Sequence, residues 1–88
     1  MIMNPKFELV EIAGEYMAVP VGDEAEAFQG VVALTNATFF LLQKMNVQQT
    51  KESLLELLTN EFEVDSSIAQ KDLDELLPKL FELGLITE

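Results

Sequence analysis

The hydrophobic period of the sequence changes at one point, and this change constrains the fold more than any other feature of the chain. Residues 30–34 read Gly-Val-Val-Ala-Leu, an apolar run with the β-branched residues typical of a strand. From Asn36 onward the apolar residues recur at the three- and four-residue spacing of an amphipathic helix. Only Thr35 and Asn36 separate the two patterns. The sequence therefore predicts a strand that continues into a helix without a loop.

Three β-type segments are predicted in the N-terminal part of the chain. Residues 7–12 and 15–20 are short strand-like runs separated by a turn at Gly14, which can adopt the positive φ of a tight hairpin. Pro20 cannot donate a ladder hydrogen bond, so it marks an edge or the end of the second strand. A third strand over residues 28–34 would complete an antiparallel meander.

Three helices are predicted to follow, at residues 36–45, 50–61 and 66–83. Gly84 is the expected left-handed stop of the last helix. Pro78 lies inside that helix and removes one backbone hydrogen bond, at a cost of about 3 kcal/mol if unrelieved, so we expect a kink or two short helices there. A polar side chain that can cap the first turn stands at the start of each helix: Thr35 or Asn36, Thr50, and Asp65 or Ser66.

Strands followed by helices predict an α+β domain. With 88 residues the chain is expected to form one domain, a three-stranded antiparallel meander followed by a three-helix bundle. The short helix connections also suit a winged helix-turn-helix arrangement.

The composition excludes several classes of function. The chain has no Cys and no His, which removes disulfides, thiolate chemistry and the usual zinc ligands, and no cofactor is expected. Its net charge of −11 repels phosphate backbones, so we expect no nucleic-acid partner. The sequence shows neither a signal peptide nor an apolar run of about 20 residues, so we expect a cytoplasmic protein with no membrane partner.

Four segments in a fixed order resemble the PqqD family, small proteins of pyrroloquinoline quinone biosynthesis and related peptide-modifying pathways. Residues 7–20, FELVEIAGEYMAVP, resemble the opening hairpin, and residues 30–42, GVVALTNATFFLL, resemble the strand-to-helix junction. Residues 50–65 resemble the second helix and its link, and residues 69–85 resemble the last helix with its Leu-x-x-x-Gly-Leu ending. The chain departs from the family at Thr35, where Asn is usual, at Leu42, where Trp is common, and at Pro78.

The resemblance implies a non-catalytic peptide-recognition element. Such proteins bind the leader segment of a ribosomally made precursor peptide and present it to a modifying enzyme, often a radical SAM enzyme. The leader would add as a strand beside the third strand and lie in a groove against the third helix. The residues that this implies for the strand edge are Gly30, Val31, Val32, Ala33 and Leu34, and those for the helix are Ala69, Asp72, Leu73, Leu76 and Leu77.

Each of these positions also has a structural explanation. Leucines at helical spacing are usually core residues, and Asp72 could form a local cap or salt bridge as readily as bind a basic leader residue. An open strand edge could also pair with a second copy of the chain, so a homodimer formed by strand pairing or domain swapping is an alternative.

Three other functions fit the same residues less well. A winged helix-turn-helix DNA-binding regulator shares the predicted topology, but its recognition helix needs clustered Arg and Lys, and here the lysines are scattered and Arg is absent. An acidic carrier protein is suggested faintly by Asp65-Ser66-Ser67, which lies too late in the chain for the helices that should follow. For an enzyme, the sequence offers no catalytic set of residues.

Overall fold

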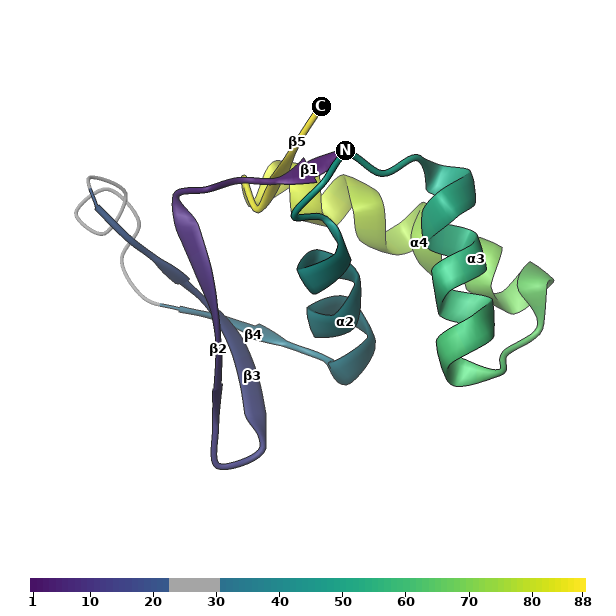
Figure 1. Ribbon diagram of the computed structural model, residues 1–88, viewed down its shortest axis with the longest axis horizontal. Coiled ribbons are helices and arrows are strands. Elements are labelled where there is room, and N and C mark those ends of the chain that lie inside the picture. Colours follow the sequence, from purple (N-terminus) through teal and green to yellow (C-terminus); the bar gives the residue numbers. More distant parts are fainter. Residues whose placement is uncertain (23–30) are drawn as a thin grey trace.

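The computed structural model describes residues 1–22 and 31–88 and has an α+β fold, with a three-stranded antiparallel sheet followed by three helices, as predicted (Figure 1). The observed helix bounds lie within one residue of the expected ranges. The elements are β1 (Ile2–Met3), β2 (Phe7–Ile12), β3 (Glu15–Pro20), β4 (Val32–Leu34), α2 (Asn36–Lys44), α3 (Lys51–Phe62), α4 (Ser66–Glu82) and β5 (Ile86–Thr87).

The sheet has the strand order β2-β3-β4, and both pairings are antiparallel. The β2–β3 hairpin turns at Ala13 and Gly14, whose φ angles of 53° and 81° are those of a tight turn that matches the twist of the two strands. Figure 1 shows this hairpin projecting away from the helices, which lie on one side of the sheet. The predicted third strand is observed as β4, while its expected first residues, 28–30, lie outside the described part of the chain.

Local capping explains how β4 continues directly into α2. Thr35 keeps an extended backbone, with φ −76° and ψ 163°, and its hydroxyl oxygen accepts a hydrogen bond from the Thr38 N–H at 3.1 Å. One residue therefore ends the strand and caps the helix, so no loop is needed. Thr50 caps α3 in the same way and forms a capping box with Ser53.

The last helix continues through Pro78 as one element of 17 residues, so the expected division into two short helices is not found. Pro78 and Asp74 are both exposed, and the Asp74 carbonyl that loses its partner lies on the solvent side, where water can hydrogen-bond to it. The helix ends at Glu82, and Gly84, two residues later, has φ 77°. The Leu85 N–H donates to the Leu80 carbonyl at 3.0 Å, which completes the predicted left-handed stop.

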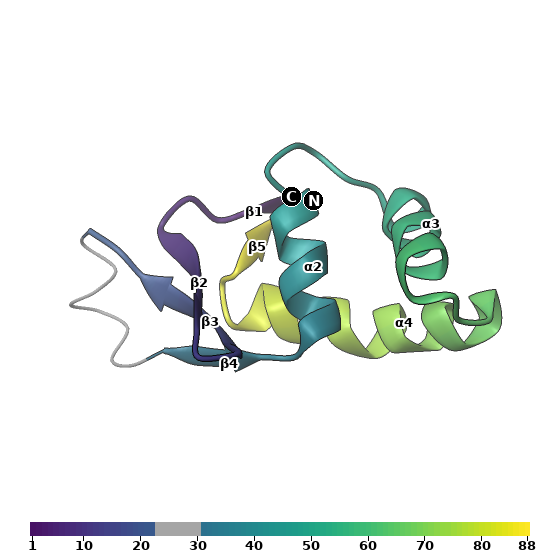
Figure 2. The same ribbon diagram turned by 60° about the horizontal axis from the view of Figure 1, so that its bottom comes forward.

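A second, two-stranded sheet joins the two ends of the described chain, and no sequence pattern predicts it. β1 pairs with β5, with Ile2 opposite Thr87 and Met3 opposite Ile86. Figures 1 and 2 show the two termini close together above α2. The core lies between the sheets and the helices, and its buried members are Phe7, Ala18, Leu41, Leu42, Met45, Leu54, Leu58, Ala69, Leu73, Leu77, Leu80, Leu85 and Ile86.

The cap of α4 is expected to make stability depend on pH. The Asp65 carboxylate accepts hydrogen bonds from the Ser67 N–H and hydroxyl, both at 2.8 Å, and these bonds lower the pKa of Asp65 from its ordinary value of 3.8. A folded-state pKa below the unfolded value stabilises the fold above pH 3.8, and that contribution is lost as the pH falls through the folded pKa. Asp65→Asn retains a cap that does not titrate.

We therefore expect the wild type to be more stable than Asp65→Asn at pH 7, and the difference to shrink below about pH 4. Urea denaturation of both proteins over this pH range measures the difference in the free energy of unfolding. A difference that is the same at pH 7 and at pH 2.5, or one that grows toward low pH, would contradict this account.

Candidate functional site

Strand β4 is one of the two edge strands of the main sheet, and β2 is the other. Among the residues that the structure describes, β4 pairs only with β3, through Tyr16 opposite Leu34, Met17 opposite Ala33 and Ala18 opposite Val32. Backbone N–H and C=O groups on the other side of an edge strand are available to a further strand. The edge is short, and its continuation before Val31 falls within residues 23–30, outside the described ranges.

A groove of about 340 Å³ runs along this edge, between β4, the start of α2 and the C-terminal half of α4. Figure 2 shows the β4–α2 junction with α4 passing beside it. Most of the lining is apolar. The residues are Val32, Ala33, Leu34, Thr35, Thr38, Leu76, Lys79, Leu80 and Leu83.

A second hollow of about 270 Å³ extends the groove toward the N-terminal half of α4. The two hollows share Thr35, Thr38, Leu76 and Lys79, and the second adds the carboxylates of Asp72 and Glu75. The groove is therefore acidic at one end and apolar at the other, where Leu83 lies. Leu83 lies eleven residues after Asp72, and at the rise of an α-helix this separation is about 16 Å, which is the length of roughly five residues of extended chain.

The structure brings together part of the residue set that the sequence predicted. Val32, Ala33 and Leu34 form β4, and exposed Val31 directly precedes it. Gly30 lies outside the described residues. Asp72 and Leu76 both line the groove, so one predicted carboxylate and one predicted leucine face the same side of α4 as the strand edge.

The other three residues predicted on the helix are core residues instead. Ala69, Leu73 and Leu77 are 1%, 0% and 7% exposed and belong to the hydrophobic core, and none of them lines either hollow of the groove. They are spaced four residues apart and form one stripe along α4, turned toward the other helices. This corrects their assignment to the peptide-binding surface.

Two groove residues that the sequence reasoning missed are Leu80 and Leu83. They follow Leu76 at four and seven residues, so they lie on the same face of α4 as Leu76. The same spacing is present in the sequence, but the predicted set contains residues of both faces and ends at Leu77. Lys79 and Glu75 lie on the borders of the same face.

Within the described ranges, no group of three or more His, Cys, Asp or Glu side chains is placed to hold a metal ion. None of the helices in those ranges has the length and hydropathy needed to cross a bilayer.

No family model matches the chain, and no curated protein and no solved structure shows significant similarity to it. The resemblance to the PqqD family therefore rests on the four sequence segments given above, and the function must be argued from the β4 edge and the groove beside it.

Proposed function

We propose that this chain is a non-catalytic peptide adaptor. It binds the leader segment of a ribosomally synthesised precursor peptide as an added strand on β4, and it presents that peptide to a modifying enzyme, of the radical SAM type that the PqqD resemblance implies. The observation that carries the proposal is the juxtaposition of an open strand edge and an apolar groove, with Val32–Leu34 on one side and Leu76 on the other.

The energetics require both parts of this site. Each hydrogen bond to the edge contributes about 0.5–1.5 kcal/mol, whereas ordering the backbone of a flexible peptide costs about 1–2 kcal/mol per residue. A three-residue strand cannot offset that cost through its backbone alone. Burying one Leu- or Phe-sized side chain of the peptide contributes roughly 1.5–3 kcal/mol. Affinity therefore depends on anchors placed against Leu76 and Leu83.

The charges of the groove indicate the kind of peptide that fits. Asp72 and Glu75 mark one end, and Leu83 marks the apolar end. In an extended peptide, every second side chain points to the same face. The preferred ligand is thus a segment of about five residues with apolar side chains at alternate positions and a basic residue at the end that meets Asp72.

A displayed library of random twelve-residue peptides tests this function directly. We expect the selected binders to show alternating apolar residues with a flanking Lys or Arg. Synthetic copies of a binder are then methylated at one backbone nitrogen at a time. Because alternate amides of an added strand point at β4, methylation at every second position should abolish binding, while methylation at the positions between should have little effect.

Helical binding in the groove would give a different pattern, since methylation would weaken binding at successive positions throughout the segment. Binders with no alternation, or a library that yields no binders, would contradict the proposal. Light scattering over a range of protein concentrations distinguishes the alternative use of the edge, because strand pairing between two copies would appear as a concentration-dependent dimer.

A further inference from the structure

A separate cleft of about 260 Å³, distinct from both hollows of the groove, lies between the β2–β3 hairpin, α2 and the C-terminal end of α3. Four aromatic rings and two carboxylates line it. The rings are those of Tyr16, Phe39, Phe40 and Phe62, and the carboxylates are those of Glu11 and Glu61. This set is unusual in a chain with only seven aromatic side chains, because more than half of them gather at one opening.

The rings are arranged as two pairs. Tyr16 and Phe39 have centroids 4.6 Å apart with their planes tilted by 41°, and Phe40 meets Phe62 edge to face at 5.5 Å. Such pairs hold each other in place and present π faces and edges to the space beside them. Tyr16, Phe40 and Phe62 are only partly buried, so a ligand can reach them.

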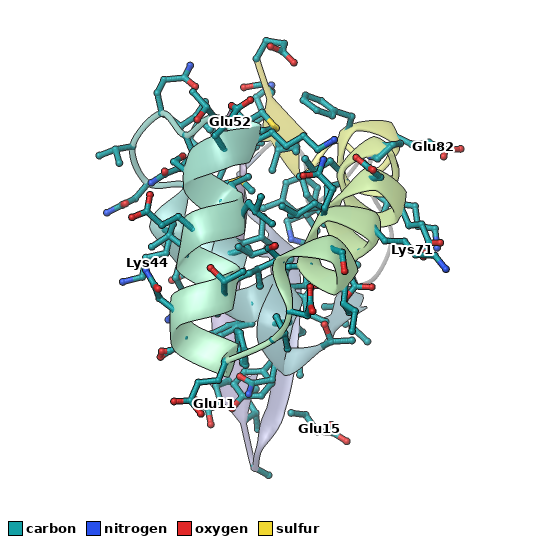
Figure 3. The ribbon with its side chains drawn as sticks, turned by 90° about the vertical axis from the view of Figure 1, so that its right-hand side faces the viewer. Glu11, Glu15, Lys44, Glu52, Lys71 and Glu82 are labelled. Atoms are coloured by element: carbon teal, nitrogen blue, oxygen red, sulfur yellow. The ribbon has the colours of Figure 1, made fainter. Side chains whose placement is uncertain are left out.

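The structure already contains one cation on this cluster. The Lys44 ammonium lies 5.4 Å from the centroid of the Phe40 ring, which is within the range of a cation–π contact. Lys44 is not among the residues that line the cleft, so the cleft itself contains two carboxylates and no basic group among the described residues. Figure 3 shows Glu11 near the C-terminal end of α3, and Lys44 farther up, beside the middle of that helix.

We propose that this cleft is a binding site for an arginine side chain presented by a partner protein. Aromatic faces attract a guanidinium, which also stacks on rings, and carboxylates such as those of Glu11 and Glu61 can accept its paired N–H groups. An ammonium makes point-charge contacts only, so lysine is the poorer ligand. An uncharged apolar side chain would gain nothing from the two carboxylates.

The cleft is separate from the peptide groove, so this inference does not rest on the proposed function. One side of α2 faces the cleft and carries Asn36, Phe39, Phe40 and Gln43. Thr38 faces the groove from a different side of the same helix. A peptide on β4 and an arginine in the cleft could therefore be bound at the same time.

The natural fluorescence of the chain provides a direct test, because Tyr16 is its only tyrosine and it contains no tryptophan. The probe is N-acetyl-arginine amide, and N-acetyl-citrulline amide is its neutral isostere. We expect a saturable change in Tyr16 emission with the arginine probe in the millimolar range, as for a few weak contacts. The response to citrulline should be at least about 5-fold weaker, and N-acetyl-lysine amide should lie between the two.

Two variants and one matched control locate the site. Glu11→Gln and Glu61→Gln each remove one exposed carboxylate and are expected to weaken arginine binding by about 2- to 5-fold. Glu52→Gln makes the same charge change at the opposite end of α3 and should leave the affinity unchanged (Figure 3). Equal responses to arginine and citrulline, equal affinity for lysine, or equal effects of Glu61→Gln and Glu52→Gln would each overturn the assignment.

Discussion

Removal of residues 85–88 is expected to abolish the cooperative fold at 25 °C. Leu85 and Ile86 are 0% and 1% exposed, so the truncation empties two core positions at once. Emptying a single buried Leu or Ile position typically costs about 2–5 kcal/mol. The truncation also removes strand β5 and the hydrogen bond that the Asn4 N–H donates to the Leu85 carbonyl at 2.8 Å.

The combined loss, roughly 4 kcal/mol or more, is comparable with the entire stability of a small domain, about 5–15 kcal/mol. Circular dichroism during urea denaturation measures the effect. Removal of Glu88 alone is the matched control, since this residue is exposed and lies outside β5, and it should leave the midpoint unchanged. A truncation at residue 84 that unfolds cooperatively at the wild-type midpoint would show that the end sheet contributes little.

The elements that the sequence predicted well are those fixed by local chemistry. Thr35, Thr50 and Asp65 each cap a helix through a hydrogen bond to a backbone N–H two or three residues away, so the signal and its effect lie in the same short segment. Gly84 has the positive φ that ends α4 for the same local reason. The hairpin at Gly14 and the change of hydrophobic period at Thr35 are further local signals.

The elements that could not be predicted depend on contacts between distant residues. β1 and β5 have two residues each, too few for any alternation to be visible, and they pair across almost the whole chain. The aromatic cleft is likewise assembled from four separate elements, β2, β3, α2 and α3, and its rings resemble ordinary core residues in the sequence. The apolar residues of α4 cover a wide arc, and only the packing of α2 and α3 shows which of them remain at the groove.

The distinction between core and groove on α4 leads to the second large effect. Leu73→Ala is expected to destabilise the fold by about 2–5 kcal/mol, because the side chain is fully buried and its removal leaves a cavity. Leu76→Ala should cost less than Leu73→Ala, because Leu76 is only partly buried and lines the groove. The free energy of unfolding, from urea denaturation, measures both changes.

The two substitutions should affect peptide affinity in the opposite order, with the larger loss in Leu76→Ala. For a peptide selected from the library, Leu76→Ala removes part of the surface that holds an apolar anchor, so its affinity is expected to fall by about 10-fold, which corresponds to roughly 1.4 kcal/mol. Leu73→Ala, measured at a temperature where it remains folded, should bind with nearly wild-type affinity because its side chain does not reach the groove. Loss of binding in Leu73→Ala with no loss in Leu76→Ala would move the peptide away from the groove and would contradict strand addition at β4. Leu73 and Leu76 are thus only three residues apart on α4, yet we expect Leu73 to stabilise the fold and Leu76 to contact the peptide.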